Sequence, residues 1–406
     1  MNEFWEMNKP RIHQYPLAKT VDRNLKMLQS ICHQPDLKQL SASQLMGERS
    51  YLTGATFNNR MSPGKSCRLI DCKEDTIAVN LPREDDWGLT AAWLDGPELK
   101  FGDWDGINSI LRRKTVHDLL PQAQLLGIAA APVNSEIPNH KAQPIPQINP
   151  EFTVSPKPPL VLDLSSLWAG PLCGHILHLC GAKVIKLESI TRPDGARQGN
   201  EQFFKLLNQG KSSVALDLSN QNGHKTLTKI INKADIVIES SRPRALEQMG
   251  INPQALVKTR KNFTWISITG YGRQEPYRNW IAYGDDAGVA AGLSQLMKRA
   301  TGNYQIAGDA IADPITGIQA ALLAWQNWLG KRSRLISLSL RDVTTYALQA
   351  ELDREGIKKT TLSLARWWNQ ATSRTPHEGI IERPINFNCQ DLGASNDVVL
   401  QKLEIA

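Results

Sequence analysis

The stretch VLDLSSLWAGPLCGHILHLCGAKVIKLE, residues 161–188, decides the fold of this chain. It starts with an apolar strand pattern, continues through a helical pattern near residues 171–180 and ends with a second strand pattern, KVIKL. A strand, a helix and a strand in this order form a right-handed crossover between parallel strands. The alternation continues downstream in SVALDL (213–218), DIVIES (235–240) and TWISIT (264–269). The sequence therefore predicts an α/β fold built on a Rossmann-like parallel sheet.

Length and composition are those of an ordinary globular protein. The chain has 406 residues, enough for two domains, and 41% of them are hydrophobic. No apolar run reaches the length of a membrane span, and the N-terminal MNEFWEMNKPRIHQYP lacks the apolar core of a secretory signal. Six cysteines without CxxC spacing predict reduced thiols. We therefore expect a cytoplasmic protein without membrane contact.

The formal net charge of +7 raises nucleic acid as a partner. The basic residues are scattered, however, and none of the common nucleic-acid-binding motifs is present. A mild positive charge also assists the capture of a small polyanion. We therefore expect a phosphate-bearing cofactor and no nucleic acid.

A proline-rich segment divides the chain in two. Eight prolines lie from Pro132 to Pro159, and they predict a linker over residues 134–158. Before it, the strand patterns SCRLID and TIAVN precede helical patterns, the last of which ends at Gly127. Residues 1–133 are thus predicted to form a small α+β domain. Residues 159–406 are predicted to form the Rossmann-like domain, ending in an extended tail.

The segment CGHILHLC, residues 173–180, raises the question of a metal site. On a helix the two cysteines share one face and both histidines lie on the other, so four ligands cannot converge on one ion. The histidine pair could bind a metal with help from elsewhere, but no neighbouring acid completes a metal-hydrolase motif. We expect no metal, and we interpret the segment as an amphipathic helix with cysteine inside and histidine outside.

The loop SSLWAGP, residues 165–171, joins the first strand of the sheet to this helix. In a doubly wound sheet, phosphates and nucleotides dock at this first turn, where helix N–H groups lack internal partners. Neither GxGxxG nor a P-loop is present in the chain. The loop is therefore predicted to bind a cofactor other than the usual NAD or ATP.

The ordered series of motifs resembles one known family. The run 161–188 is followed by RPDGAR, GKSSVALDL, ADIVIESSRPRALEQMGI and WISITGYGRQEPY. Over residues 158–350 this series closely resembles the class III CoA-transferases, such as the formyl-CoA and carnitine CoA-transferases, and their relatives the α-methylacyl-CoA racemases. The resemblance implies an intertwined homodimer and a Rossmann-like domain that binds coenzyme A. It also implies a smaller domain that closes the active site.

The small domain of that family ordinarily follows the large one. Here its counterpart resembles residues 65–133, which include CRLIDCKEDTIAVNLPREDDW and LLGIAAAPV, and so precedes the large domain. The tail DLGASNDVVLQKL resembles the family's closing stretch. Too few residues follow Asp342 to build the small domain again. The sequence therefore predicts a rearranged order.

The resemblance assigns the catalytic nucleophile to Asp313 in GDAIADPITG. In the family an aspartate carries CoA as a thioester, formed through a mixed anhydride with the acyl group of the donor. From the residues alone, Asp313 suits the N-cap of a helix and Pro314 its first position. Plain capping is the alternative role, and the two roles are compatible.

The segment AYGDDAGVAAGL tests the racemase alternative. The racemases that this stretch resembles use a histidine beside an aspartate here, whereas this chain has Tyr283. No histidine lies between residues 225 and 376, so a proton shuttle with two bases lacks one partner. We interpret the neighbouring Asp285 and Asp286 as a solvated helix start.

Basic and polar residues near the carboxyl ends of the predicted strands are candidates for holding CoA, since its phosphates attract arginine. By motif position these cofactor-binding candidates are Trp168, Arg192, Arg197, Ser240, Arg242, Arg244 and Tyr283. The first hypothesis is an enzyme that transfers CoA from an acyl-CoA to a carboxylic acid. The second is a non-catalytic protein of the same fold that binds acyl-CoA or a partner, because residues such as Ser189 depart from the family's pattern.

Overall fold

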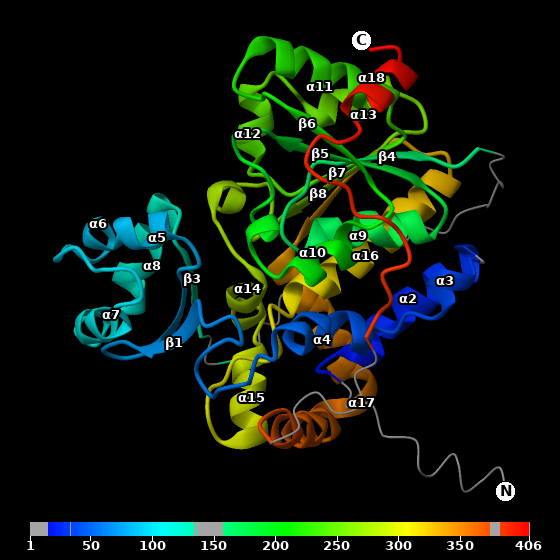
Figure 1. The fold of residues 1–406 in the computed structure, drawn as a ribbon. Coiled ribbons are helices and arrows are strands. Elements are labelled where there is room, and N and C mark those ends of the chain that lie inside the picture. Colours follow the sequence, from blue (N-terminus) through cyan, green and yellow to red (C-terminus); the bar gives the residue numbers. More distant parts are fainter. Residues whose placement is uncertain (1–14, 33, 134–135, 137–156, 374–381, 406) are drawn as a thin grey trace, which may run out of the picture.

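A six-stranded parallel sheet forms the centre of the computed structural model, which describes residues 15–32, 34–133, 136, 157–373 and 382–405 (Figure 1). The strands are β4 (Leu160–Asp163), β5 (Lys183–Ser189), β6 (Ser212–Leu216), β7 (Ile236–Glu239), β8 (Thr264–Thr269) and β9 (Arg334–Ser339). All neighbouring pairs run parallel. The predicted α/β class with a Rossmann-like sheet is confirmed.

The strand order β6-β5-β4-β7-β8-β9 reverses between β4 and β7. Val161 pairs with Val184 of β5 on one side and with Ile236 of β7 on the other. In open parallel sheets, ligands bind at the carboxyl ends of the strands where the order reverses. In this chain the loops after β4 and β7 meet at that point.

Helices cover both faces of the sheet. One core contains α9 (Ala169–Leu179), α10 (Glu201–Asn208), α16 (Ala312–Leu329) and α17 (Leu340–Ala371). The core on the other face contains α11 (Gln221–Lys233), α12 (Pro243–Gln248), α13 (Pro253–Thr259) and α18 (Asn396–Lys402). Adjacent residues such as Val161 and Leu162 belong to opposite cores, as the two-residue period of a strand requires.

A smaller antiparallel sheet carries its own helices. Its strands are β1 (Cys67–Asp71), β2 (Thr76–Asn80) and β3 (Ala129–Pro132), and one face packs against α5 (Glu84–Gly88), α6 (Thr90–Leu94), α7 (Trp104–Leu111) and α8 (Val116–Leu126). Gly127 ends α8 with φ of 76°, as predicted. The other face packs on α14 (Gly284–Ala290), which is followed by α15 (Leu293–Thr301). The small sheet therefore packs against α14 (Figure 1).

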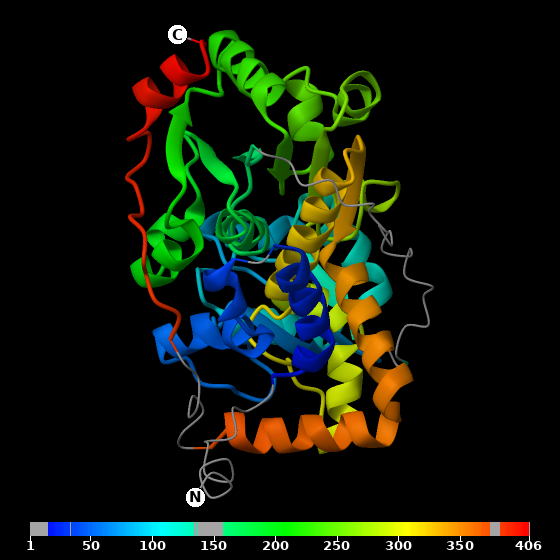
Figure 2. The same ribbon diagram turned by 90° about the vertical axis from the view of Figure 1, so that its right-hand side faces the viewer.

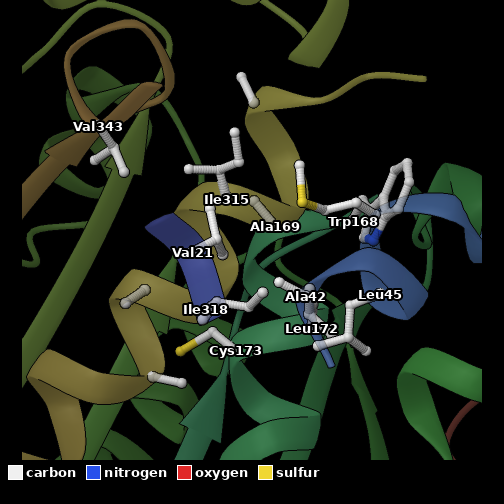
Figure 3. Packing of buried hydrophobic residues seen from close by; sticks show 14 of the residues in the cluster. Val21, Ala42, Leu45, Trp168, Ala169, Leu172, Cys173, Ile315, Ile318 and Val343 are labelled. Carbon is white, nitrogen blue, oxygen red and sulfur yellow. The ribbon is translucent and has the colours of Figure 1, made fainter. Parts of the chain in front are cut away.

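Three helices near the N-terminus join the core of the large sheet. They are α2 (Ala18–Cys32), α3 (Pro35–Lys38) and α4 (Ala42–Thr53), and the sequence analysis did not predict them. Figure 3 shows side chains of α2 and α4 among those of α9 and α16: Val21, Ala42 and Leu45 lie close to Leu172, Cys173, Ile315 and Ile318. The division of the chain at residue 133 stays a prediction. Within the described residues, these helices pack with the large sheet and not with the small one.

The C-terminal tail runs along the side of the molecule from the N-terminal helices to α18 (Figure 2). Backbone hydrogen bonds fasten it to the edge of the large sheet, from Gly210 N–H to Asn388 and from Ser395 N–H to Ser213. The predicted linker lies outside the described residues except for Glu136, Lys157 and Pro158. No helix in the described parts of the chain has the length and apolar character that crossing a bilayer requires.

Helix α9 differs from the amphipathic helix that the sequence predicts. Cys173 and Cys180 are buried, as expected, but His175 is buried too and His178 is half-buried. The expectation of histidines outside is therefore wrong. The cause is that α9 is covered on nearly all sides, by the sheet, α16 and the tail. Burial, with the nearby charges of Arg383 and Lys211, lowers the pKa of His175 well below its ordinary value.

Candidate active site

Asp313 lies in the first turn of α16. The helix begins at Ala312 and its N-cap is Ile311, so Asp313 is the second helical residue and Pro314 the third. The prediction of Asp313 as N-cap and Pro314 as first helical residue is therefore wrong by two positions. The physical reason is a tight turn just before, in which Asp313 N–H donates to the carbonyl of Ala310 (2.9 Å). The free N–H groups of a first turn still favour a carboxylate here.

The carboxylate of Asp313 lies against Gly284, the first residue of α14. A Cβ at position 284 would be 2.5 Å from Oδ2 of Asp313 and 2.2 Å from the carbonyl oxygen of Ala310. Only glycine therefore fits without displacing this turn. The Gly284 N–H also donates a hydrogen bond to the Asp313 carboxylate. The first turns of α14 and α16 thus meet at this group.

Asp285 and Asp286 follow Gly284 and are buried, with 5% and 0% of their surface exposed. Their interpretation as a solvated helix start is therefore wrong. Asp285 accepts a hydrogen bond from Ala310 N–H (2.7 Å), while Asp286 accepts from the side chain of Asn80 in β2 (2.9 Å) and from Tyr283 N–H (3.0 Å). The small sheet covers α14, and this covering removes both carboxylates from water.

Burial raises the pKa of all three carboxyls. It raises the pKa of Asp313 to about 7, with a further rise from the charges of Asp285 and Asp286, against the lowering effects of Arg49 and the Gly284 N–H. The pKa rises to about 6 for Asp285 and to about 7 for Asp286, again mainly through burial. Of the three, Asp285 and Asp286 are buried, whereas Asp313 is only half-buried. Asp313 is thus the member of the group that a substrate can approach.

Arg49 of α4 reaches the same place from the N-terminal helices. Its Nε donates to Oδ2 of Asp309 (2.9 Å), and its Nη2 pairs with the other carboxylate oxygen. Its guanidinium also lies over the ring of Trp168, 4.9 Å from the centroid. Sequence reasoning missed Arg49 because nothing in the helix around it signals a partner 260 positions away.

The loop after β4 is held at the point where the strand order reverses. Trp168 is the N-cap of α9, is 2% exposed and packs edge-on against Phe203. Ser166 N–H donates to the hydroxyl of Ser240 (3.1 Å), which follows β7. Two of the predicted cofactor-binding residues, Trp168 and Ser240, therefore lie on the two loops that meet there.

Two buried lysines support this loop from beneath. Lys186 donates to the carbonyl of Ser165 (2.7 Å) and pairs with Asp194 (2.9 Å). Lys211 donates to the carbonyl of Pro171 (2.8 Å) and pairs with Asp163 (2.8 Å). Lys186 thus fixes the start of the loop, and Lys211 fixes the first turn of α9, which follows the loop.

Most of the predicted arginines gather near one another. Burial lowers the pKa of Arg242, and the guanidinium groups of Arg244, Arg83 and Arg192 lie close enough for their charges to lower it further. Within the described residues, Arg192, Arg242 and Arg244 form no ion pair and are exposed. Arg83, which pairs with Asp86 and belongs to the small unit, was not predicted. Like charges without partners mark a place where an anion would be stabilised.

Tyr283 and Arg197 have different surroundings. Tyr283 is half-buried beside this arginine group, and burial raises its pKa to about 12. Arg197 pairs with Glu188 (2.7 Å) and lies over Phe204, so its charge is already compensated within the protein. Of the predicted cofactor residues, Arg197 therefore has the least capacity left for a ligand.

Comparison with known proteins identifies the large sheet. Residues 159–351 match the model of CoA-transferase family III. The comparison thus shows that this segment is similar to members of that family. Its strands β4 to β9, the arginine-bearing loops after them and Asp313 all fall inside the family III segment. Arg49, Asn80 and Arg83 lie before it.

Several proteins named as CoA-transferases are similar to this chain. The succinate–glutarate CoA-transferase of Agrobacterium fabrum is 30% identical over 47% of this chain and 53% of its own length. The formyl-CoA:oxalate CoA-transferase of Bradyrhizobium diazoefficiens is 31% identical over 40% of each chain. An acyl-CoA transferase of Fusarium pseudograminearum is 27% identical over 58% of this chain and 55% of its own length. The chain thus spans about half the length of the curated relatives it matches.

Solved structures of similar proteins match a comparable share of the chain. A CAIB/BAIF family protein from Brucella suis is 25% identical, with a TM-score of 0.43 over 48% of this chain and 55% of its own. The protein Rv3272 from Mycobacterium tuberculosis is 27% identical, with a TM-score of 0.44 over 51% of this chain and 60% of its own.

Proposed function

We propose that this protein transfers CoA from an acyl-CoA donor to a carboxylic acid, with Asp313 as the nucleophile. The observation that carries the proposal is the environment of the Asp313 carboxylate: its partial burial, its hydrogen bond and its raised pKa. It is half-buried at the start of α16, accepts a hydrogen bond from Gly284 N–H and has a pKa of about 7. A nucleophile is best poised when its pKa lies near the working pH.

The proposed reaction keeps the acyl group activated at every step. The Asp313 carboxylate attacks the carbonyl of the donor thioester and expels the CoA thiolate, which leaves a mixed anhydride. The thiolate then attacks the aspartyl carbonyl of the anhydride, releases the donor acid as its carboxylate and leaves CoA on Asp313 as a thioester. The acceptor carboxylate attacks this thioester, and the thiolate it displaces takes the acceptor's acyl group. The product is a new acyl-CoA, and Asp313 is regenerated.

Coenzyme A is proposed to bind across the loops after β4 and β7. Trp168 and Ser240 lie on those loops, and the exposed group Arg192, Arg242 and Arg244 would meet its phosphates. Tyr283 lies beside the same arginines. Arg83 of the small unit is also close, but it is already paired with Asp86. The intertwined homodimer that the family resemblance implies belongs to this proposal, and sedimentation analysis tests it.

Removing one of these arginines tests the CoA site. We expect Arg242→Gln or Arg244→Gln to weaken CoA binding by about tenfold each, the effect of one charge-assisted contact to phosphate. Isothermal titration calorimetry measures it, with Arg299→Gln, an exposed arginine on α15, as the control. If both variants bind CoA as tightly as the control, the phosphates lie elsewhere.

The covalent intermediate tests the reaction itself. Wild-type protein incubated with an acyl-CoA is expected to gain the mass of CoA less one water, on the peptide that contains Asp313. Hydroxylamine should release the CoA, because an aspartyl thioester is activated whereas a bound cofactor is not.

Two other outcomes would replace the proposal. CoA binding without any adduct would favour the non-catalytic acyl-CoA-binding protein. Exchange of the α-hydrogen of the acyl group with deuterated water, without CoA transfer, would favour the racemase. The last outcome needs two bases, and Tyr283, with its pKa raised to about 12 by burial, stands where the related racemases have histidine.

A further inference from the structure

Helix α4 is fixed to the rest of the molecule on two sides. Glu48 forms a buried ion pair with Arg383 of the tail, with Nε and Nη2 of the arginine 2.9 and 2.8 Å from the two carboxylate oxygens. Ser50 is hydrogen-bonded to the hydroxyl of Tyr15 (2.8 Å). A residue on this helix therefore has little freedom to move. Arg49 lies between these two anchored positions.

Arg49 links two parts of the proposed site. On one side its guanidinium lies over Trp168, the residue that ends the loop after β4. On the other it holds both oxygens of Asp309, a carboxylate that is 1% exposed. The pair fits the planar two-pronged geometry in which arginine binds carboxylate most strongly.

Asp309 begins the turn that leads to Asp313. The next residue, Ala310, has φ of 42°, a conformation that L-residues rarely adopt. Hydrogen bonds hold it there: its N–H donates to Asp285, and its carbonyl accepts from Asp313 N–H. A residue that fixes Asp309 therefore fixes the start of the turn from which the Asp313 side chain projects.

We infer that Arg49 is a positioning residue for the proposed reaction, one that holds the turn 309–313 in place and favours the ionised carboxylate of Asp313 by its charge. This inference rests on the proposed function, but its physical content can be measured without turnover. It also gives the N-terminal helices a share in the site, although they lie outside the segment that matches the family.

The charges around Asp313 oppose one another. Arg49 is the cation whose field lowers the pKa of Asp313, whereas Asp285 and Asp286 raise it together with burial. The same arginine lowers the pKa of Asp285. The titratable groups that face this cluster include Cys67, Asp285, Asp286, Asp309, Arg49 and the tyrosines Tyr15, Tyr271 and Tyr283. Loss of Arg49 would remove the cation that lowers the pKa of both Asp313 and Asp285.

The test compares Arg49→Gln with Arg49→Lys. The carboxyl carbon of Asp313 is followed by NMR in protein labelled with ¹³C-aspartate and assigned with Asp313→Asn. We expect its titration midpoint to rise by about one pH unit in Arg49→Gln, the usual effect of losing a neighbouring opposite charge. In Arg49→Lys the charge remains and the midpoint should return most of the way, which also covers the case in which Arg49→Gln does not fold. Arg60→Gln, which breaks an exposed ion pair with Asp71, is the control.

A kinetic readout accompanies the titration. The acid limb of kcat/KM should shift with the midpoint in Arg49→Gln, and kcat should fall more than KM rises, since the substrate does not need Arg49 in order to bind. An unchanged midpoint in Arg49→Gln, or a midpoint in Arg49→Lys equal to that in Arg49→Gln, would overturn the inference. These results differ from a failure of the proposed function, which would appear as wild-type protein without any CoA adduct whatever the midpoint.

Discussion

Replacing Asp313 with asparagine is expected to lower CoA transfer by about 10³-fold or more, because the amide cannot form the anhydride or the thioester. Asparagine has nearly the same shape and can still accept the hydrogen bond from Gly284 N–H, so the turn before α16 should persist. CoA affinity should change little, since the proposed anchoring residues are elsewhere. Steady-state kinetics and calorimetry on the same preparation measure both quantities.

The wild-type enzyme should show the matching pH dependence. Only the ionised carboxylate can attack, and the pKa of Asp313 is about 7. Activity should therefore be full well above pH 7 and fall about tenfold per unit below it. Asp353→Asn, an exposed acid on α17, serves as the control and should leave the profile unchanged. Substantial transfer by Asp313→Asn, or a flat profile through pH 7, would remove Asp313 from the reaction.

The pH argument also explains why the site could be predicted only in part. The motif GDAIADPITG pointed to Asp313, and the helix start beside it was placed within two residues. The shift in its pKa could not be predicted, because it depends on burial by a sheet encoded more than 200 residues away. The hydrogen bond between Asn80 and Asp286 spans 206 positions, and the pair of Arg49 and Asp309 spans 260. Such contacts have no local pattern.

The large sheet was predictable for the opposite reason. Its strands are short apolar runs separated by helical periods and turn residues, and each of these signals lies within a few positions. The features that the sequence predicted wrongly depend on which elements pack against a helix. His175 and Asp285 occupy positions that look polar and solvated along the sequence, yet the tail and the small sheet bury them. Periodicity reports which residues share a face, but not what lies opposite that face.

The stability of the large sheet and the helix that follows its first strand should depend strongly on the buried charge of Lys211. Lys211→Met is expected to lower the free energy of unfolding by about 3–5 kcal/mol, the usual cost of removing one member of a buried ion pair. Lys211 satisfies three acceptors: Asp163 (2.8 Å), the carbonyl of Pro171 (2.8 Å) and the side chain of Asn208 (3.0 Å). Methionine fills a similar volume but satisfies none of them.

The carboxylate of Asp163, which Lys211→Met leaves without its partner, explains the size of this effect. Asp163 is fully buried, and although burial opposes its ionisation, the charges of Lys211 and Lys186 hold its pKa below the ordinary value. Without Lys211 it must stay charged with less compensation or take up a proton. Its stabilising effect as an ionised group is present at neutral pH and is lost as the pH falls through its lowered pKa. The deficit in Lys211→Met should therefore be largest at neutral pH and shrink in acid.

Urea unfolding followed by circular dichroism and fluorescence measures the difference, with coincident curves as the check on two-state behaviour. Lys205→Met is the matched control, because its pair with Glu201 is exposed on α10 and should contribute little to stability. If the two variants lose similar stability, the Lys211 pair is not what stabilises the first turn of α9. If Lys211→Met is the less stable variant, its affinity for CoA should also fall, because Trp168 is the N-cap of the helix that Lys211 holds at Pro171.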